Sequence, residues 1–316
     1  MDSTDWPAAE FQAHRAHLRA VAYRMLGSLT EADDAVQEAW LRLTRTDADD
    51  VRNLRAWLTT VVSRVCLDML RTRVARREDP LSVHVPDPVV TSVADDPEEH
   101  ALLADSVGLA LLVVLDTLSP AERLAFVLHD IFAVPFEQIG PVLDRSPAAA
   151  KQLASRARHR LRGTTAPAAA DPARQRAVAA AFLAAARGED FEGLLSVLDP
   201  DVVLRADAGA GPLGPSRLVR GAPEVIATAR LFSPMARFAR PVLVNGTPGF
   251  LVVHNGQPFA LIGMTIRDDR ITEIDILADP DRLSRLDLAG LIDLPGPDAP
   301  RRTPTRTAGR AGLIAF

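Results

Sequence analysis

Residues 136–162 read FEQIGPVLDRSPAAAKQLASRARHRLR, and this stretch guides the interpretation of the whole chain. The pattern predicts a helix, a tight turn and a second helix, for which Ser146 is a natural N-cap and Pro147 a natural first residue. An apolar stripe follows at helical spacing, formed by Ala150, Leu153, Ala154, Ala157 and Leu161. These features are typical of a recognition helix that enters the major groove of DNA.

The opposite side of this second helix is polar and cationic. No acidic residue occurs between Arg145 and Arg162. The alternative interpretation is an ordinary amphipathic helix with a solvated basic face. The preceding helix and the short turn favour DNA binding over that alternative. The polar side carries Lys151, Gln152, Ser155, Arg156, Arg158, His159 and Arg162.

The length of 316 residues predicts two or three domains. The net charge of -5 would by itself argue against a nucleic-acid partner, but the charge is unevenly distributed. Residues 51–77 hold seven arginines against one acid, Asp68. Because phosphate binding depends on local basic patches, the whole-chain charge does not exclude DNA.

Several classes of protein are disfavoured. A single cysteine, Cys66, excludes an internal disulfide and a cysteine-rich zinc site, and we interpret it as a core thiol. His14 and His17 are interpreted as surface residues, so the sequence suggests neither a metal nor a cofactor. The acidic N-terminus is no signal peptide, and the longest apolar run, 107–115, is too short to span a bilayer. A cytoplasmic protein without a membrane partner is the simplest expectation.

Residues 5–77 read as three helices. Gly27 is placed to end the first, Thr30 to begin the second with Asp33 as a capping partner, and the third runs from about Leu54 to Arg77. Residues 78–105 are rich in proline, aspartate and valine and predict a linker. A second helical segment, 106–163, contains the helix-turn-helix pattern, and 164–173 form a second linker.

The remainder predicts an α+β domain over 174–288, in which two short helices precede a curved antiparallel sheet. Asn255-Gly256 is a type I′ hairpin signal, and Asp268-Asp269 is a plausible turn. The tail, 289–316, has the composition of a disordered segment. Strand character occurs at 201–206, 241–245, 249–254, 257–267 and 270–277.

Four segments together carry a family resemblance: AYRMLGSLTEADDAVQEAWLRL (22–43), LRAWLTTVVSRVCLDMLRTRVARR (54–77), LSPAERLAFVLHDIFAVPFEQIGPVL (118–143) and SPAAAKQLASRARHRLR (146–162). In order and spacing they resemble regions 2 and 4 of extracytoplasmic-function RNA polymerase sigma factors. NGTPG (245–249) and the ending at 270–288 resemble a SnoaL-like domain of the nuclear-transport-factor-2-like fold. A known subgroup fuses the two. The implied architecture is multidomain: two all-α sigma domains followed by an α+β cone-shaped domain.

The resemblance implies a sigma factor that binds core RNA polymerase, through its β′ clamp helices and β flap, and directs it to promoter DNA. Binding to the clamp helices would involve the acidic second helix; its alternative is an acidic first turn that serves only the helix dipole. The implied polymerase contacts are Asp33, Asp34, Gln37 and Glu38.

Region 2 would also hold the minus-10 element as a single strand, which requires a cationic groove and polar groups that read base edges. A solvated arginine-rich helix end is the alternative. The implied minus-10 residues are Arg52, Asn53, Thr60, Arg64, Asp68, Arg71, Arg73, Arg76 and Arg77. The implied minus-35 residues of region 4 are Arg145, Ser146, Lys151, Gln152, Ser155, Arg156, Arg158 and Arg162.

The C-terminal fold would enclose a conical pocket, for which Asp207, His254, Glu273 and Asp275 are candidate polar groups. They form no convincing acid–base pair, so we expect no catalytic residue and a regulatory domain, with a small-molecule ligand possible. A regulatory contact with the sigma domains is expected at Asn245, Gly246, Pro248, Gly249, Asp279, Pro280 and Asp281, with Gly246 and Gly249 in tight turns.

Two other classes of function remain as alternatives. An enzyme could use the C-terminal pocket with the helical part as a targeting module. A one-component repressor could combine the helix-turn-helix with a ligand-sensing domain. The resemblance to region 2 disfavours both, because neither needs a strand-melting helix beside a polymerase-binding one.

Overall fold

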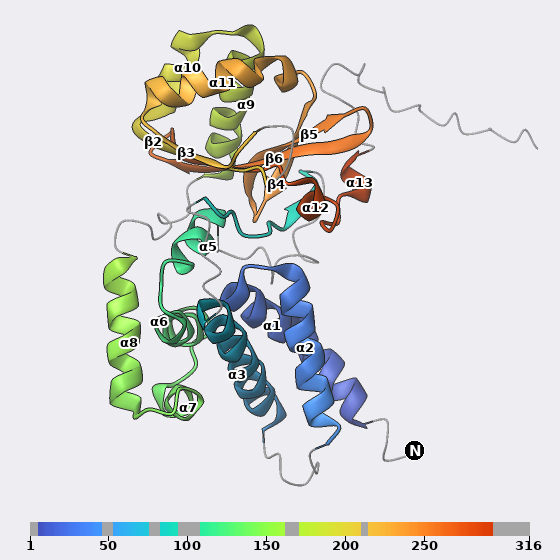
Figure 1. Cartoon of the computed structure of the whole chain (residues 1–316), viewed down its shortest axis with the longest axis vertical. Helices are drawn as coiled ribbons and strands as arrows, with labels where there is room; N and C mark the ends of the chain where they lie inside the picture. The colour runs from blue at the N-terminus through green and yellow to red at the C-terminus, as the bar shows by residue number, and fades with distance from the viewer. Residues whose placement is uncertain are drawn as a thin grey trace, which may run out of the picture.

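The computed structural model describes residues 6–45, 53–75, 83–93, 108–161, 171–209 and 214–292. Figure 1 shows a helical half, formed by the first helices of the chain, and above it a curved sheet covered on its outer side by helices. Within the described part of the chain, no helix has both the length and the apolar character needed to cross a membrane.

Three helices form the first domain: α1 (Trp6–Leu26), α2 (Leu29–Leu43) and α3 (Leu54–Ala75). Gly27 ends α1 with φ of 70°. The expected capping position of α2 at Thr30 is wrong by two residues. Ser28 is the N-cap, and its hydroxyl accepts a hydrogen bond from the Glu31 amide at 3.4 Å, so Glu31 occupies the position expected for Asp33.

The second helical domain contains α5 (Leu109–Leu115), α6 (Pro120–Phe126), the π-helical turn η2 (Val127–Ile131), α7 (Phe136–Val142) and α8 (Pro147–Arg160). The predicted cap of α8 is confirmed, because Ser146 Oγ accepts from the Ala149 amide at 3.2 Å. The predicted apolar stripe is buried throughout. Gly140 permits the tight turn, since an added Cβ would lie 2.7 Å from the Arg145 carbonyl oxygen.

The C-terminal domain begins with α9 (Pro172–Gly188) and α10 (Phe191–Val197) and continues with α11 (Ala222–Ala236). These helices cover one face of the sheet (Figure 1). In the sheet the strand order is β1-β4-β5-β6-β7-β2-β3. The strands are β1 (Val90–Thr91), β2 (Leu198–Asp207), β3 (Arg217–Arg220), β4 (Ala239–Val244), β5 (Thr247–His254), β6 (Gln257–Arg267) and β7 (Arg270–Leu277).

The predicted strands are confirmed, and β6 and β7 match their expected bounds. The expectation of an antiparallel sheet is wrong at one pair, because β2 pairs parallel with β7. Strand β3 and helix α11 were not predicted. After β7 come the short helices α12 (Pro280–Leu283) and α13 (Ala289–Ile292). The tail expected to be disordered therefore starts with a helical turn, and its residues 293–316 lie outside the described part.

Three hairpins share one turn geometry. Both central residues have positive φ at Asn245-Gly246 (49° and 75°), Asn255-Gly256 (51° and 74°) and Asp268-Asp269 (49° and 62°). This is the type I′ requirement that favours asparagine and glycine. Gly249, expected in a turn, instead lies inside β5, where an added Cβ would be 2.4 Å from the Ile262 carbonyl oxygen. Its role is close strand packing.

The linker is part of the sheet. Its residues Val90 and Thr91 form β1, which pairs antiparallel with β4 through Val244 and Leu243. The sheet face turned away from α9 and α11 shares one continuous apolar core with both helical domains, in which Leu251 and Leu277 join Leu109 and Leu115. The segment expected to be a simple connection therefore lies between the two halves of the molecule (Figure 1).

Candidate functional site

Helix α8 presents its predicted DNA-binding face to solvent. Lys151, Gln152 and Ser155 are exposed, and the Arg156 side chain is 64% exposed. Arg145 is exposed in the turn before the helix. Ser146 is occupied as the N-cap, and Arg162 lies outside the described residues.

Two acids beneath this face, buried Glu122 and more exposed Asp130, position its arginines. Glu122 carboxylate oxygens lie 3.0 Å from Arg160 and 3.6 Å from Arg156. Asp130 lies 3.6 Å from Arg158. Burial would raise the pKa of Glu122, but hydrogen bonds from Ser119 and the two arginine charges outweigh it and lower that pKa. Arg160, which was not among the predicted contacts, belongs to this set.

Helix α3 distributes its predicted minus-10 residues between solvent and internal contacts. Asp68 and Arg71 are exposed and 3.6 Å apart. Arg73 points inward, where it donates to the Leu26 carbonyl at 3.2 Å and pairs with Glu31. Arg73 therefore links α3 to α1 and α2 in this structure, and its role at the minus-10 element stays a prediction.

Two further polar residues of this set serve α3 itself. Asn53 caps the helix by accepting from the Ala56 amide at 3.1 Å, and the Thr60 hydroxyl donates to the Ala56 carbonyl at 3.0 Å. Arg52, Arg76 and Arg77 lie outside the described residues.

On α2, the predicted polymerase contacts divide in the same way. Asp34 and Gln37 are exposed. Asp33 accepts two hydrogen bonds from Arg19, at 2.7 and 3.0 Å, and Glu38 pairs with Arg42 at 2.9 Å. Asp33 thus ties α2 to α1.

The two helical domains contact each other directly. Exposed Arg64 of α3 donates to the Pro141 carbonyl of α7 at 3.1 Å. Phe132 packs edge-on against His17 at 5.3 Å, and Arg24 lies 5.2 Å from the same ring. The interpretation of His17 as a surface residue is therefore wrong: burial, with the charge of nearby Arg55, lowers its pKa to about 4.

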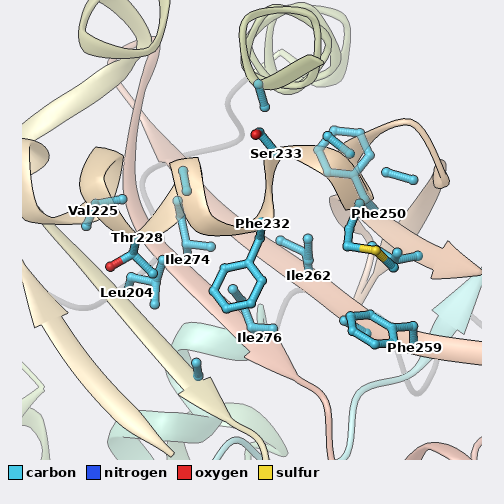
Figure 2. A pocket seen from close by; sticks show the side chains of 18 of the residues that line it. Leu204, Val225, Thr228, Phe232, Ser233, Phe250, Phe259, Ile262, Ile274 and Ile276 are labelled. Carbon is cyan, nitrogen blue, oxygen red and sulfur yellow. The ribbon is translucent and has the colours of Figure 1, made fainter. Parts of the chain in front are cut away.

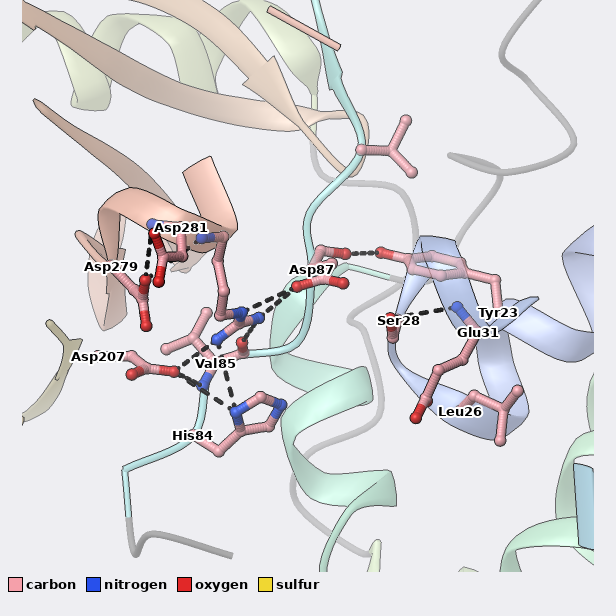
Figure 3. A network of polar contacts seen from close by, with 12 residues as sticks. Tyr23, Leu26, Ser28, Glu31, His84, Val85, Asp87, Asp207, Asp279 and Asp281 are labelled. Atoms are coloured by element: carbon pink, nitrogen blue, oxygen red, sulfur yellow. Dashed lines mark hydrogen bonds and ion pairs between the residues drawn. The ribbon is translucent and has the colours of Figure 1, made fainter. Parts of the chain in front are cut away.

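A second connection runs through the linker, and Arg282 of α12 is its centre. Figure 3 shows Asp87, Val85 and Asp207, which surround it. Its guanidinium donates to Asp87 Oδ1 at 2.5 and 3.0 Å, to Asp207 Oδ2 at 2.6 Å and to the Val85 carbonyl at 2.6 Å. Asp207 also accepts from the Val85 amide at 3.1 Å and lies 3.4 Å from His84. We call Arg282, Asp87, Asp207 and the Val85 backbone the linker clamp.

Electrostatics favour the charged form of the clamp aspartate. Burial would raise the pKa of Asp207, but hydrogen bonds from His84 and the Val85 amide, with the charge of Arg282, lower it below the ordinary value. The predicted residue Asp279 contributes indirectly, because it caps α12 by accepting from the Asp281 and Arg282 amides. Pro280 and Asp281 are exposed.

Asn245 connects three parts of the chain. Its side-chain oxygen accepts from the Val89 backbone amide at 2.9 Å, and the backbone amide of Asn245 donates to the Val89 carbonyl at 2.8 Å. Its Nδ2 donates to the Tyr23 hydroxyl at 3.2 Å, and that hydroxyl donates to the Asp87 carbonyl at 2.6 Å. Of the other predicted contact residues, Gly246 is at the turn tip, while Pro248 and Gly249 are buried in β5.

Two segments of the chain match models of known protein families. Residues 11–76 match the family model Sigma-70 region 2, and residues 108–161 match Sigma-70, region 4. The chain is 38% identical over 290 residues to the Probable ECF RNA polymerase sigma factor SigI of Mycobacterium tuberculosis, covering 90% of this chain and 98% of that protein. This chain belongs to the extracytoplasmic-function (ECF) sigma factor family.

Two further comparisons extend over most of this sigma factor. The ECF RNA polymerase sigma factor SigJ of Mycobacterium tuberculosis is 39% identical over 290 residues, covering 87% of this chain and 93% of that one. The crystal structure of SigJ superposes with a TM-score of 0.71 at 36% identity, covering 89% and 99% of the two chains.

These findings confirm the expected architecture of two helical sigma domains followed by an α+β domain of SnoaL-like type. The sigma factor binds core RNA polymerase and directs promoter-specific transcription initiation.

The C-terminal domain of the sigma factor contains a cavity between α9, α11 and the sheet (Figure 2). Of the four polar groups predicted for it, none is among the residues that line it. Asp207 faces the linker, and Glu273 and Asp275 pair with Arg205 at 2.7 and 3.0 Å on the face away from the cavity. His254 packs against the rings of Phe238 and Phe259, at 4.9 and 6.4 Å.

The guanidinium of Arg205 pairs with the carboxylates of both Glu273 and Asp275, and Asp275 is the more deeply buried of these two acids. Burial raises the pKa of Asp275 to about 6, against the opposing charge of Arg205. Cys66 is fully buried in α3, and burial raises its thiol pKa to about 12, which makes it a poor nucleophile. Among the described residues, no three potential metal ligands come together.

Proposed function

We propose that the C-terminal domain restrains this sigma factor in cis by holding the linker and both helical domains in a compact arrangement. The observation that carries the proposal is the linker clamp, in which Arg282 joins α12 and β2 to Asp87 and Val85. Asn245 adds a second attachment at Val89 and reaches Tyr23 of the first domain.

Promoter geometry supports restraint. By their names the minus-10 and minus-35 elements lie about 25 base pairs apart, which is roughly 85 Å along the duplex at about 3.4 Å per pair. In the compact arrangement α3 and α7 are in contact, with Arg64 only 3.1 Å from the Pro141 carbonyl. One sigma factor can therefore read both elements only after its helical domains separate, and the linker must leave the clamp for that to happen.

We assign the surfaces from their exposure. Asp34 and Gln37 make the first contacts with the β′ clamp helices, and Asp33 and Glu38 join after exchanging Arg19 and Arg42 for polymerase cations. Minus-10 DNA is bound by the exposed side of α3, from Asn53 and Thr60 through Arg64, Asp68 and Arg71, and by the arginines that flank it. Region 4 contacts the β flap.

Minus-35 DNA is read by Lys151, Gln152, Ser155 and Arg156, with Arg145, Arg158 and Arg162 on phosphates. Arg156→Ala should weaken binding of minus-35 duplex while core-polymerase binding survives. Arg176→Ala, at an exposed position of α9, is the control and should change neither. Equal loss of both activities in a folded Arg156→Ala protein would contradict the assignment.

The cavity wall contains no carboxylate or imidazole among its described residues, so we assign no catalytic residue to this sigma factor. The domain acts through contact and not through turnover. Of the polar groups that the enzyme alternative would use, Asp207, Glu273 and Asp275 face the other way, and His254 is not a lining residue of the cavity.

The deciding experiment is transcription in vitro with purified core polymerase, comparing the full chain with residues 1–170 and with full-length Arg282→Ala. We expect specific transcripts from all three and more from the two altered forms. Circular dichroism must first show that residues 1–170 are folded, because the truncation uncovers core residues such as Leu109. Equal transcription from the full chain and Arg282→Ala would refute restraint by the clamp.

A further inference from the structure

The cavity of the C-terminal domain has a volume of about 110 Å³ and is walled mainly by aliphatic and aromatic carbon. Figure 2 shows Phe232 reaching from α11 toward Ile262 and Ile276 of the sheet, with Phe250 and Phe259 to one side. A protein cavity of about 150 Å³ lined by leucine, isoleucine and phenylalanine accommodates benzene. The space therefore suits a molecule of one ring, and of two rings after small side-chain movements.

The polar atoms of the wall already have partners within the protein. The Thr228 hydroxyl donates to the Glu224 carbonyl at 3.0 Å. The Ser233 hydroxyl is 3.3 Å from a Glu189 carboxylate oxygen and 3.2 Å from the Arg230 carbonyl. A ligand with acceptor groups only, such as a carboxylate, would lose its hydration without receiving a hydrogen bond from these hydroxyls, which costs several kcal/mol, on the order of 2–7.

The one charged side chain among the described lining residues is Arg217, which is half-exposed and lies 5.4 Å from the centre of the Phe232 ring. Its guanidinium therefore rests on an aromatic face. A neutral ligand needs no counter-ion there, whereas an anion would have to compete for this cation with water and with the ring.

Strand β2 connects the cavity to the linker clamp. Ala206 and Ala208 line the cavity, and Asp207 between them turns to the opposite face, where it accepts from Val85 and Arg282. The Asp207 carbonyl is held by the Ala278 amide at 2.7 Å. A molecule that fills the cavity would therefore contact Ala206 and Ala208, and the residue between them, Asp207, holds the linker.

We propose that this cavity is a binding site for a neutral, hydrocarbon-like small molecule of one or two rings, and that its occupation tightens the linker clamp through Ala206–Ala208. The second half of the proposal rests on the restraint described under Proposed function. The ligand is then a co-inhibitor that stabilises the compact sigma factor by filling space behind β2.

Binding is tested on the full chain by isothermal titration calorimetry with toluene, naphthalene and 1-naphthoate as probes. We expect one-to-one binding of at least one hydrocarbon and at least tenfold weaker binding of the carboxylate than of naphthalene. Failure of both hydrocarbons to bind up to their solubility limits overturns the site. Tighter binding of 1-naphthoate than of naphthalene overturns the neutral class and assigns Arg217 to an anion.

Two substitutions on one helix locate the binding. Ala229 of α11 lines the cavity, whereas Ala227 of the same helix is exposed and does not. Ala229→Phe should weaken hydrocarbon binding at least tenfold, and Ala227→Phe should leave it within twofold. If Ala229→Phe does not fold, Phe232→Ala replaces it: the larger space should favour naphthalene over toluene by a further threefold or more. Unchanged binding in the variant used overturns the location.

Hydrogen exchange of the full chain tests the connection without polymerase. With saturating naphthalene, exchange of the Val85 amide, bound to Asp207, should slow at least threefold more than that of the Val89 amide, bound to Asn245. Equal slowing of the two amides overturns the connection through β2 while leaving the binding site. Neither result depends on transcription, so failure of this proposal is distinguishable from failure of restraint in cis.

Discussion

The two faces of the C-terminal sheet differ in chemistry although the same strands build both. Toward α9 and α11, Ile274 and Ile276 of β7 line an apolar cavity. Toward the sigma domains, Glu273 and Asp275 of the same strand pair with Arg205. The comparison teaches that carboxylates which look like pocket residues in the sequence serve the contact face. In this domain the cavity and the carboxylates therefore lie on opposite faces of the sheet.

The largest expected effect is at the clamp. Arg282→Ala leaves Asp87 and Asp207 without their shared cation at a largely buried position, which should lower the free energy of unfolding by about 3–5 kcal/mol. Urea unfolding measures this loss, and transcription in vitro should rise. Arg285→Ala, three residues further along at an exposed position, is the matched control with little effect. Equal behaviour of the two variants would remove the functional difference between the faces.

The ionic cluster of the contact face predicts a pH dependence. An unfolded aspartate titrates near pH 3.9, roughly, whereas burial raises the pKa of Asp275 to about 6. Between these values the folded chain binds more protons than the unfolded chain. The contribution of this carboxyl to the free energy of unfolding therefore falls as pH rises from about 4 to 6, by up to about 2–3 kcal/mol, and then levels off.

The test of this dependence compares the native chain with Asp275→Asn. The free energy of unfolding of the native chain minus that of the variant should decrease between about pH 4 and pH 6. Urea unfolding at several pH values provides the difference. A difference that rises with pH would mean that Arg205 lowers the pKa of Asp275, and the cluster would then be a simple ion pair.

A smaller effect is expected at the hairpin that holds the linker. Asn245→Gly keeps the positive φ of the turn but removes the side-chain bonds to Val89 and Tyr23, which should cost about 1–3 kcal/mol. Asn255→Gly makes the same change in the next hairpin, where φ is 51° and the side chain is exposed. Thermal unfolding should show a larger loss of stability for Asn245→Gly than for Asn255→Gly. Equal losses would assign the effect to turn geometry.

The smallest effect is expected inside the cavity. Thr228→Val replaces a hydroxyl that donates only to its own helix, so stability should change by less than about 0.5 kcal/mol and transcription should stay the same. Denaturant unfolding and transcription in vitro measure the two. A large loss of transcription would show that the cavity face carries a polar function, and the contrast between the faces would fail.

Local patterns were sufficient for much of the fold. The Ser146 cap, the stripe on α8, and the hairpin turn at Asn255-Gly256 each depend on residues within a few positions of one another. Helix α11 and strand β3 were not predicted, since α11 carries Pro223 and Pro234 and β3 has only four residues. Short or proline-containing elements depend on tertiary packing for their stability.

Some of the candidate site residues follow from local spacing, whereas others depend on tertiary packing. The exposed positions of α8 follow from helical spacing, because its buried stripe defines the opposite face. The inward turn of Arg73 toward Glu31 could not be predicted, since it depends on how α3 packs against α2. Arg282 directly follows the predicted contact residues Asp279, Pro280 and Asp281, but its partner Asp87 is 195 residues away. No local signal indicated that pairing.

The sequence by itself determined the helix-turn-helix, the cap of α8, the hairpin turns and the sigma-factor family, because each depends on short-range spacing or on motifs in a fixed order. Only the tertiary structure decided which sheet face carries Asp207, Glu273 and Asp275, and that the linker adds a strand beside β4. Alternation along a strand assigns its side chains to two faces, but it does not show which face meets the cavity and which meets the sigma domains. The face is decided by what packs against it, and here Val89 meets Asn245 across 156 residues.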